Sequence, residues 1–253
     1  MHVFSKFFLL FVIALTSSPL VHGQQKTTQS VDLKRAKALL AEVQLNAGTL
    51  TLTTHPLPNA DLNFAYSRSN WKPLVKATKE ANRDHLIIRQ PEEKNTNMGE
   101  REHNKYTIKI PQALETSLKL RMGAGEGKVD MHGAKINRVD MEAGAGDFNV
   151  NLANTSVASL KVSAGVGALT LNLGGARTRD LDADISGGIG DLTLVLPRSS
   201  GVRVRVSGLG GIDNKGLRKQ NGYYVNDAYG KSAQNVDITV SAGLGNIKMT
   251  LEK

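Results

Sequence analysis

The sequence contains no cysteine, which excludes several kinds of site at once. A chain without thiols has no disulfides, no thiolate metal ligands, no cysteine nucleophile and no lipid-modified cysteine near its N-terminus. Aromatic residues are scarce as well, at 5% of the chain. With 253 residues, of which 40% are hydrophobic, the chain can still bury a core without cross-links, so we expect a folded protein.

Long apolar runs are also lacking, with one exception near the N-terminus. Residues 7–15 are apolar and follow Lys6, but a membrane-spanning helix needs about 20 such residues. Small residues follow and lead to Gly23, in a pattern typical of a cleavage site. We therefore predict a signal peptide at 1–23, then a flexible mature N-terminus at 24–32. The expected location is periplasmic or extracellular, without a transmembrane anchor after cleavage.

The charge of the chain is +9, and it is spread out without a run of like charges. Proteins that bind nucleic acids usually gather lysine and arginine in patches, so we expect no nucleic-acid partner. An excess of positive charge suits weak attraction to an acidic polymer or an anionic surface, and it equally suits an ordinary solvated surface.

Alternation of apolar and polar residues, typical of strands with one buried face, dominates the rest of the chain. It is clear at 50–53 and at 85–89. A charged segment at 92–104 interrupts it. We therefore divide the chain into an N-terminal β region, 33–96, and a repeat region, 104–253.

The repeat region is built on a glycine motif, Ala/Gly-Gly-x-Gly. Successive copies are 19 residues apart from Gly125 to Gly144 and 21 apart from Gly144 to Gly165. A degenerate copy lies at 207–210, and a truncated one at 46–48. We expect the glycines to form corners between strands, because glycine adopts positive φ without a Cβ clash. The predicted corner glycines are Gly125, Gly127, Gly144, Gly146, Gly165, Gly167, Gly188, Gly190, Gly243 and Gly245.

A unit of this size cannot bury its apolar face alone, so neighbouring units must stack. We predict an all-β fold, a right-handed β-helix-like solenoid of short glycine-punctuated strands. An antiparallel β-sandwich produces the same alternation and stays open as the alternative. Charges at outward positions before the corners change sign from unit to unit, which favours stacking in chain order. These residues are Lys119 and Arg121, Asp140 and Glu142, Lys161, Asp182 and Asp184, Arg203 and Arg205, and Asp237.

Several stretches of the chain resemble the toast-rack domain family. They lie at 45–53, 86–91, 110–131, 201–206 and 241–251. This family is related to the soluble domains of bacterial cell-wall-antibiotic response proteins and is similar to the adhesin-head domains of exported bacterial proteins. The resemblance covers most of the chain from about residue 40. It implies a β-helix-like fold and an envelope location, and it carries no catalytic residues to transfer.

The motifs do not indicate a cofactor or a metal. Glycine loops that hold nucleotide phosphates open directly into a helix, whereas each motif here precedes a predicted strand. Asp191 follows Gly190 directly, and the repeat is longer than that of calcium-binding nonapeptides. The histidines are scattered without ligand spacing. We therefore predict no cofactor and no metal site.

An acidic row is the strongest candidate for catalysis. Asp180, Asp182 and Asp184 share one face of a predicted strand, as suits general acid and base residues. Basic residues at equivalent positions of the neighbouring units, such as Lys161 and Arg203, favour a structural charge ladder instead.

An insertion at 217–234 brings together Tyr223, Tyr224 and Tyr229. Clustered tyrosines supply rigid contact area for a partner, and a loop that caps the solenoid would carry them equally well. We predict a non-catalytic exported envelope or extracellular module for interaction, sensing or adhesion. Its partner would be an envelope polymer or a protein. The alternative is a polysaccharide-active β-solenoid enzyme that acts on an acidic polymer.

Overall fold

The computed structural model describes residues 24–81, 83–92 and 102–252, so the predicted signal peptide lies outside the described residues. Within these ranges the chain is all-β, apart from one short 3-10 helix, η1 (Ser69–Trp71). The strands are β1 (Gln25–Asp32), β2 (Ala38–His55), β3 (Asn59–Tyr66), β4 (Leu74–Lys79), β5 (Asp84–Arg89), β6 (Asn104–Pro111), β7 (Glu115–Asp130), β8 (Ile136–Asn151), β9 (Ser159–Val166), β10 (Leu169–Asn172), β11 (Leu181–Ile189), β12 (Leu192–Leu196), β13 (Gly201–Leu209), β14 (Ile212–Lys215), β15 (Arg218–Gln220), β16 (Tyr223–Val225), β17 (Asn235–Leu244) and β18 (Ile247–Leu251).

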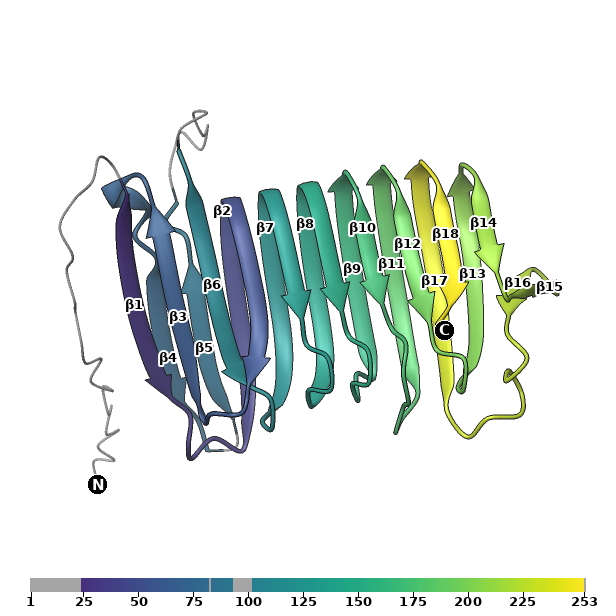
Figure 1. The fold of residues 1–253 in the computed structure, drawn as a ribbon, viewed down its shortest axis with the longest axis horizontal. Helices are drawn as coiled ribbons and strands as arrows, with labels where there is room; N and C mark the ends of the chain where they lie inside the picture. The colour runs from purple at the N-terminus through teal and green to yellow at the C-terminus, as the bar shows by residue number, and fades with distance from the viewer. Residues whose placement is uncertain (1–23, 82, 93–101, 253) are drawn as a thin grey trace, which may run out of the picture.

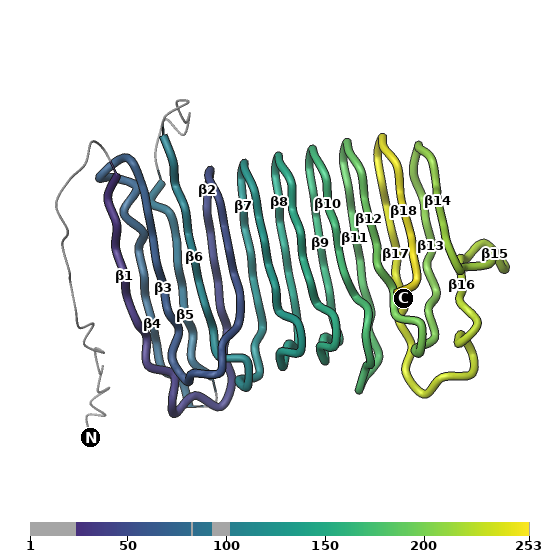
Figure 2. Tube along the Cα trace, in the orientation of Figure 1, coloured from purple at the N-terminus to yellow at the C-terminus, as the bar shows by residue number. Residues whose placement is uncertain are grey.

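The repeat folds into rungs that stack along the long axis of the molecule (Figure 1). Each rung rises in a first layer, turns at a glycine corner and returns in a second layer, as the Cα trace in Figure 2 shows. In β2, β7 and β8 the strand continues through the corner, whereas later rungs consist of two strands, such as β9 and β10. Equivalent halves of neighbouring rungs pair in parallel and in register. The prediction of a solenoid-like all-β fold is confirmed, and an antiparallel sandwich does not describe the repeat.

The core lies between the two layers and follows from the alternation in the sequence. In β7, for example, Leu118, Leu120 and Met122 point inward and are buried, while Lys119 and Arg121 point outward. The same alternation in successive rungs produces one continuous apolar cluster that extends from Val31 to Met249. Burial of this cluster is the main stabilising contribution that the stack makes.

The N-terminal segment differs from the flexible terminus that we expected at 24–32. Residues Gln25–Asp32 form β1, which pairs antiparallel with β3 along its whole length. Val31 is buried, and the Thr27 hydroxyl lies 2.9 Å from the Tyr66 hydroxyl. The polar composition of this segment therefore did not indicate a strand. Backbone hydrogen bonds to β3 hold β1 at the end of the second layer.

The two regions that we separated around 92–104 share one sheet and one core. β2 pairs with β7, and Gly48 of the truncated motif lies opposite Gly125. The segment before the repeat thus supplies its first rung. Additional strands extend the stack on the side of β2 that faces away from β7. On that side, β5 pairs with the first half of β2 and β6 with its second half.

The order of the last rungs differs from the order in the sequence. Stacking follows the chain from β2 to β12, but the next rung is β17 and β18, which pair with β11 and β12. The rung formed by β13 and β14 lies beyond it, at the end of the molecule (Figure 1). The prediction of stacking in chain order is therefore wrong for these rungs.

Burial explains why the last segment of the chain lies inside the stack. The rung of β17 and β18 buries Val236, Ile238, Val240, Ile247 and Met249. By contrast, all residues of β14 are exposed or only partly buried. A rung with a polar second half is suited to the end of a solenoid, where one face meets water.

Candidate binding face

The glycine corners leave a strip of bare backbone on the outer face of the first layer. A Cβ atom built on Gly144 would lie 2.1 Å from the carbonyl oxygen of Gly123 in the neighbouring rung, and one on Gly165 would lie 2.4 Å from that of Gly144. Side chains are excluded here because the stacked backbones approach too closely. We call Gly123, Gly144 and Gly165 the glycine floor.

A second column of corner glycines is needed for its backbone conformation. Gly125, Gly146 and Gly167 have φ values of 125°, 139° and 126°, a region that residues with a Cβ rarely adopt. Of the predicted corner glycines, Gly190 and Gly245 also belong to this column, whereas Gly188 and Gly243 continue the first one.

The first copy of the motif lies two residues earlier than the sequence alignment of the repeats predicts. Gly125 pairs with Gly146 and not with Gly144, so the corner of this rung is formed by residues 123–125. Gly127 is therefore not a corner. It lies inside the second layer opposite Phe148, whose Cδ1 would be 2.7 Å from a Cβ at this position. A shift of two residues preserves the period-two alternation of inward and outward side chains. The sequence pattern therefore could not show that Gly125 had been aligned with the wrong glycine of the next rung.

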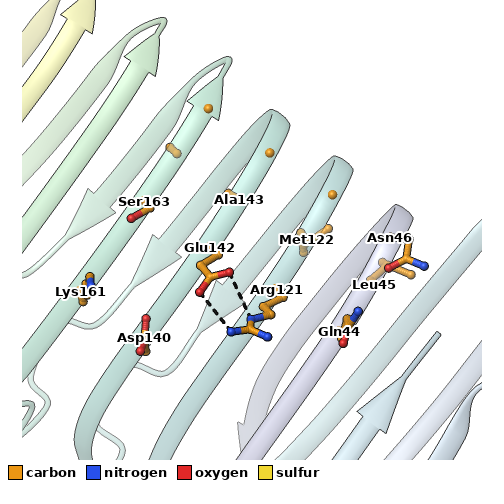
Figure 3. A pocket seen from close by; sticks show the side chains of 14 residues that line it. Gln44, Leu45, Asn46, Arg121, Met122, Asp140, Glu142, Ala143, Lys161 and Ser163 are labelled. Atoms are coloured by element: carbon orange, nitrogen blue, oxygen red, sulfur yellow. Dashed lines mark hydrogen bonds and ion pairs between the residues drawn. The ribbon is translucent and has the colours of Figure 1, made fainter. Parts of the chain in front are cut away.

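A shallow groove of about 660 Å³ runs along the glycine floor, across the rungs of β2, β7, β8 and β9 (Figure 3). Polar and charged side chains line one side of it. They are Gln44, Arg121, Asp140, Glu142, Lys161 and Ser163. Asn46 of β2 instead continues the column of the glycine floor and lies at its end (Figure 3). In the sequence, the charges and the glycines are separate features. Only the register between rungs shows that they line the same groove.

The groove carries both signs of charge in balance. Arg121 and Glu142 form an ion pair across adjacent rungs, with Nε and Oε2 3.2 Å apart (Figure 3). Asp140 lies opposite Lys119 on one side and Lys161 on the other. This part of the predicted charge ladder is present as expected.

Beside the groove, Glu42 connects three strands of the first layer. It accepts hydrogen bonds from Lys119 of β7 and Arg89 of β5, both at 3.3 Å, and lies 3.2 Å from Nε2 of His85. Burial alone would raise the pKa of this carboxyl. The hydrogen bond and charge of Lys119, the charge of His85 and the hydrogen bond of Arg89 together hold the pKa below its ordinary value.

The acidic row is divided among different roles. Asp180 accepts a hydrogen bond from the backbone of Asn235 at 2.8 Å and so fixes the start of β17. Asp184 lies opposite Lys161, as the ladder predicted. Asp182, however, lies opposite Asp237, because β17 occupies the place expected for β13. Two acidic residues thus occupy paired positions in adjacent rungs, where the ladder had predicted opposite charges.

The tyrosine insertion covers the end of the stack, and its three tyrosines do not share one environment. Arg203 lies over the rings of Tyr223, at 5.1 Å, and Tyr229, at 5.8 Å, and its Nε is 2.5 Å from Asp237. Tyr224 instead packs against the core, opposite Val204 of β13. The candidate partner surface therefore reduces to Tyr223 and Tyr229, which flank an arginine, while Tyr224 is part of the cap.

The described part of the chain offers neither a metal cluster nor a membrane span. Residues 24–81, 83–92 and 102–252 contain no group of three or more His, Asp or Glu side chains placed to hold a metal ion. None of the helical structure in these ranges has the length and hydropathy needed to cross a bilayer.

A parallel two-layered stack with an axial groove can be compared with known families. A family model described as the N-terminal domain of toast_rack matches residues 21–161 and 149–195. These overlapping matches span more than half of the chain, so the chain belongs to this family. The resemblance found in the sequence is confirmed. No curated protein matches the chain.

One solved structure supports the same fold, and a second is reported beside it. A candidate cell adhesion protein from Clostridium sporogenes ATCC 15579 is similar, with a TM-score of 0.71 and 23% identity over 90% of this chain and 100% of that one. A candidate adhesin from Bacteroides fragilis NCTC 9343 has a TM-score of 0.38 and 15% identity over 89% of this chain and 97% of that one. The first likeness establishes the fold.

Proposed function

We propose that this protein is an exported, non-catalytic adhesion module whose axial groove binds an extended envelope polysaccharide. The observation that carries the proposal is the groove itself. It runs across four stacked strands, β2, β7, β8 and β9, and its floor is bare backbone in β7, β8 and β9, where Gly123, Gly144 and Gly165 lie. Such a floor admits a linear chain along the solenoid axis, where bulky side chains would block it. Cell adhesion, the role named for the Clostridium sporogenes protein, agrees with this proposal.

The charge of the groove suits a polymer without a strong net charge. Arg121 pairs with Glu142, and Asp140 lies next to Lys161 in the register. A polyanion would meet Asp140 and Glu142 as well as the basic residues. Hydroxyl groups of a neutral polysaccharide can donate to these carboxylates and accept from Arg121 and Lys161.

Binding to purified envelope polysaccharide, measured by co-sedimentation, tests the groove. Replacing Ser163 by tyrosine adds a bulky ring beside the glycine floor, and we expect binding to fall at least tenfold. Thr170→Tyr is the matched control. It lies on the second layer of the same rung, outside the groove, and should bind as the native protein does. Equal loss in both variants, or in neither, would contradict the proposed site.

Export is proposed from the pattern of residues 1–23, in which Lys6 precedes an apolar run and small residues follow. Mass spectrometry of the protein recovered outside the cytoplasm should find a start at or near Gln24. Recovery of the protein only in the cytoplasm, with residues 1–23 still attached, would contradict the proposal of export.

A second candidate function rests on the pairing of Asp182 with Asp237. Two carboxylates on adjacent rungs, beside Arg203 and Tyr223, are the kind of arrangement that enzymes acting on acidic polysaccharides use. The ion pair between Arg203 and Asp237 supports a structural role instead. An activity screen on acidic polysaccharides, with and without calcium, separates the two. Turnover that disappears in Asp182→Asn would favour the enzyme.

A further inference from the structure

Four exposed aliphatic side chains form a ridge at the glycine corners of the last rungs. In spatial order they are Val166, Ile189, Leu244 and Leu209, and between 55% and 73% of each residue is exposed. Each lies opposite the next in the register of the sheet. They follow the edge where the chain turns from the first layer to the second, the upper edge in Figure 1. We call these residues the aliphatic ridge.

The ridge is confined to one half of the molecule. At the same position the earlier rungs carry Ala47, Ala124 and Ala145. The change from alanine to Val, Ile and Leu coincides with a change beside the glycine column. At the position two residues before the glycine column, the earlier rungs carry Arg121 and Glu142. The later rungs carry serines, which lie opposite one another on successive rungs. These are Ser163, Ser186, Ser241 and Ser207.

The strip between the serines and the second corner glycines is uncharged, with Asp191 directly beyond it, although the chain carries a net charge of +9. From each serine to the second corner glycine the four rungs read SAGVG, SGGIG, SAGLG and SGLG. Two copies of a cationic chain repel each other over most of their surface. A neutral apolar strip is the place where such copies can approach closely, and lines of exposed apolar side chains mark interaction surfaces.

The shape of the strip fits a second copy of itself. Glycines flank the ridge on both sides, so a column of bare backbone lies next to each line of side chains. Because both copies have the same rung spacing of about 4.8 Å, the side chains of one ridge meet the glycine column of the other at every rung. An isologous contact around a two-fold axis uses the same strip on both molecules.

We propose that the protein forms a two-fold dimer through the aliphatic ridge, with each ridge seated along the glycine column of the partner copy. This inference goes beyond the polysaccharide-binding role and does not depend on it. Four side chains cover much less than the roughly 800 Å² per partner of a standard interface, so the dimer is weak and depends on concentration. Many copies held together on one surface would compensate for this weakness by avidity.

Sedimentation of the purified protein from about 10 µM to about 1 mM, the range of weak association, tests the proposal. The native protein should shift from monomer to dimer as its concentration rises. Ile189→Asp should remain monomeric over the whole range. The matched control is Leu74→Asp, which replaces an equally exposed leucine of β4 far from the ridge and should dimerise as the native protein does. A native protein that stays monomeric, or a dimer that survives Ile189→Asp, overturns the proposal.

A second measurement does not depend on breaking the contact. Because the chain has no cysteine, Ile189→Cys and Leu244→Cys each introduce a single thiol. An equimolar mixture should form a disulfide-linked dimer under mild oxidation at least tenfold faster than Leu74→Cys does. Equal rates overturn the proposal. Flotation of a monomeric protein with neutral phosphatidylcholine vesicles, lost in Ile189→Asp, would also overturn it and assign the ridge to a lipid surface.

Discussion

Gly187 occupies, in its own rung, the position equivalent to Ala143, directly before that of Gly144. The two glycines nevertheless have very different surroundings. A methyl group at Gly144 would collide with the Gly123 carbonyl, which is backbone and cannot rotate away. Around Gly187, apart from its two neighbours in the sequence, no atom of the described residues lies within 4 Å of the place that a methyl group would take, and three other rungs carry Ala143, Ala164 and Ala242 there. The column that contains Gly144 therefore requires glycine, whereas the position of Gly187 directly before it does not.

We expect Gly144→Ala to lower the free energy of unfolding by about 2–4 kcal/mol, because two stacked backbones must separate. Gly187→Ala should leave it within about 0.5 kcal/mol or raise it by up to about 1 kcal/mol, because alanine restricts the unfolded chain. Urea unfolding followed by circular dichroism measures both. Equal effects of the two substitutions would contradict the difference between the two positions.

Tyr106 places a polar hydroxyl group in the apolar core. Its ring is fully buried and packs edge-to-face on Phe64, with centroids 4.9 Å apart. Its hydroxyl has no hydrogen-bond partner among residues 24–81, 83–92 and 102–252. Burial, together with the nearby Tyr66, raises the pKa of Tyr106 well above the ordinary tyrosine value.

Replacing Tyr106 by phenylalanine should leave stability unchanged or raise it by up to about 1 kcal/mol, because an unpaired hydroxyl is removed from the core. Tyr66→Phe is the control. The Tyr66 hydroxyl contacts Thr27 at 2.9 Å, so its loss should cost about 0.5–1.5 kcal/mol. Thermal unfolding measures both, and a larger loss at Tyr106 than at Tyr66 would mean that the hydroxyl has a partner.

At the scale of strands, Glu42 joins β2 to both of its neighbours in the first layer. Its contacts to His85 and Arg89 hold β5, and its contact to Lys119 holds β7. Its side chain is 20% exposed, whereas those of Lys119 and Arg89 are more than half exposed, so solvent screens part of the attraction.

The lowered pKa of Glu42 gives its contribution a pH dependence with a definite sign. A carboxyl whose pKa is lower in the folded state than in the unfolded state stabilises the fold above the unfolded value, and this stabilisation is lost as the pH falls through the folded value. We expect Glu42→Gln to cost about 1 kcal/mol at pH 7 and less as the pH falls below the ordinary glutamate value.

Urea titrations at several pH values measure this difference. Glu142→Gln is the matched control, because Glu142 is 56% exposed and pairs with Arg121, which is 65% exposed. It should cost less than about 0.5 kcal/mol at any pH. A Glu42 effect that does not change between pH 7 and pH 3 would contradict the assignment of these contacts.

The elements could largely be predicted from the sequence, because period-two alternation and recurring glycines are local signals. β1 was missed because its residues are mostly polar and its stability comes from pairing with β3, a non-local contact. The groove was not predicted as a site. Its side chains come from four strands, and the in-register pairing that gathers them, such as Arg121 with Glu142, is visible only after folding.

At the scale of the molecule, the order of the rungs was the main feature that the sequence did not reveal. Alternating charges suggested stacking in chain order, and surface ion pairs are too weak to decide such a question. Apolar burial is larger, and it favours the rung of β17 and β18 inside the stack, even though this arrangement places Asp237 opposite Asp182. Arg203 on the other side of Asp237 offsets part of that repulsion.

This order predicts an unusual pattern of hydrogen exchange. The last strands of a chain usually fray, so amides near a C-terminus are expected to exchange early. Here β17 and β18 are paired on both sides, with β11 and β12 on one and with β13 and β14 on the other. Among the described strands, β14 pairs with β18 alone. Amides of Ile247–Leu251 should therefore exchange more slowly than those of Ile212–Lys215, although they lie closer to the C-terminus.

Hydrogen exchange of the native protein, read by mass spectrometry of its peptides, measures this order directly. We expect at least tenfold greater protection in β18 than in β14, because opening β18 requires β14 to separate as well, whereas β14 can open alone. Ile238→Ala, which removes buried side-chain atoms from the inserted rung, should lower protection in β13 and β14 together with β17. If β18 exchanged first and left β13 and β14 protected, the C-terminal rung would lie at the end of the stack, in chain order, and Asp182 would not lie opposite Asp237.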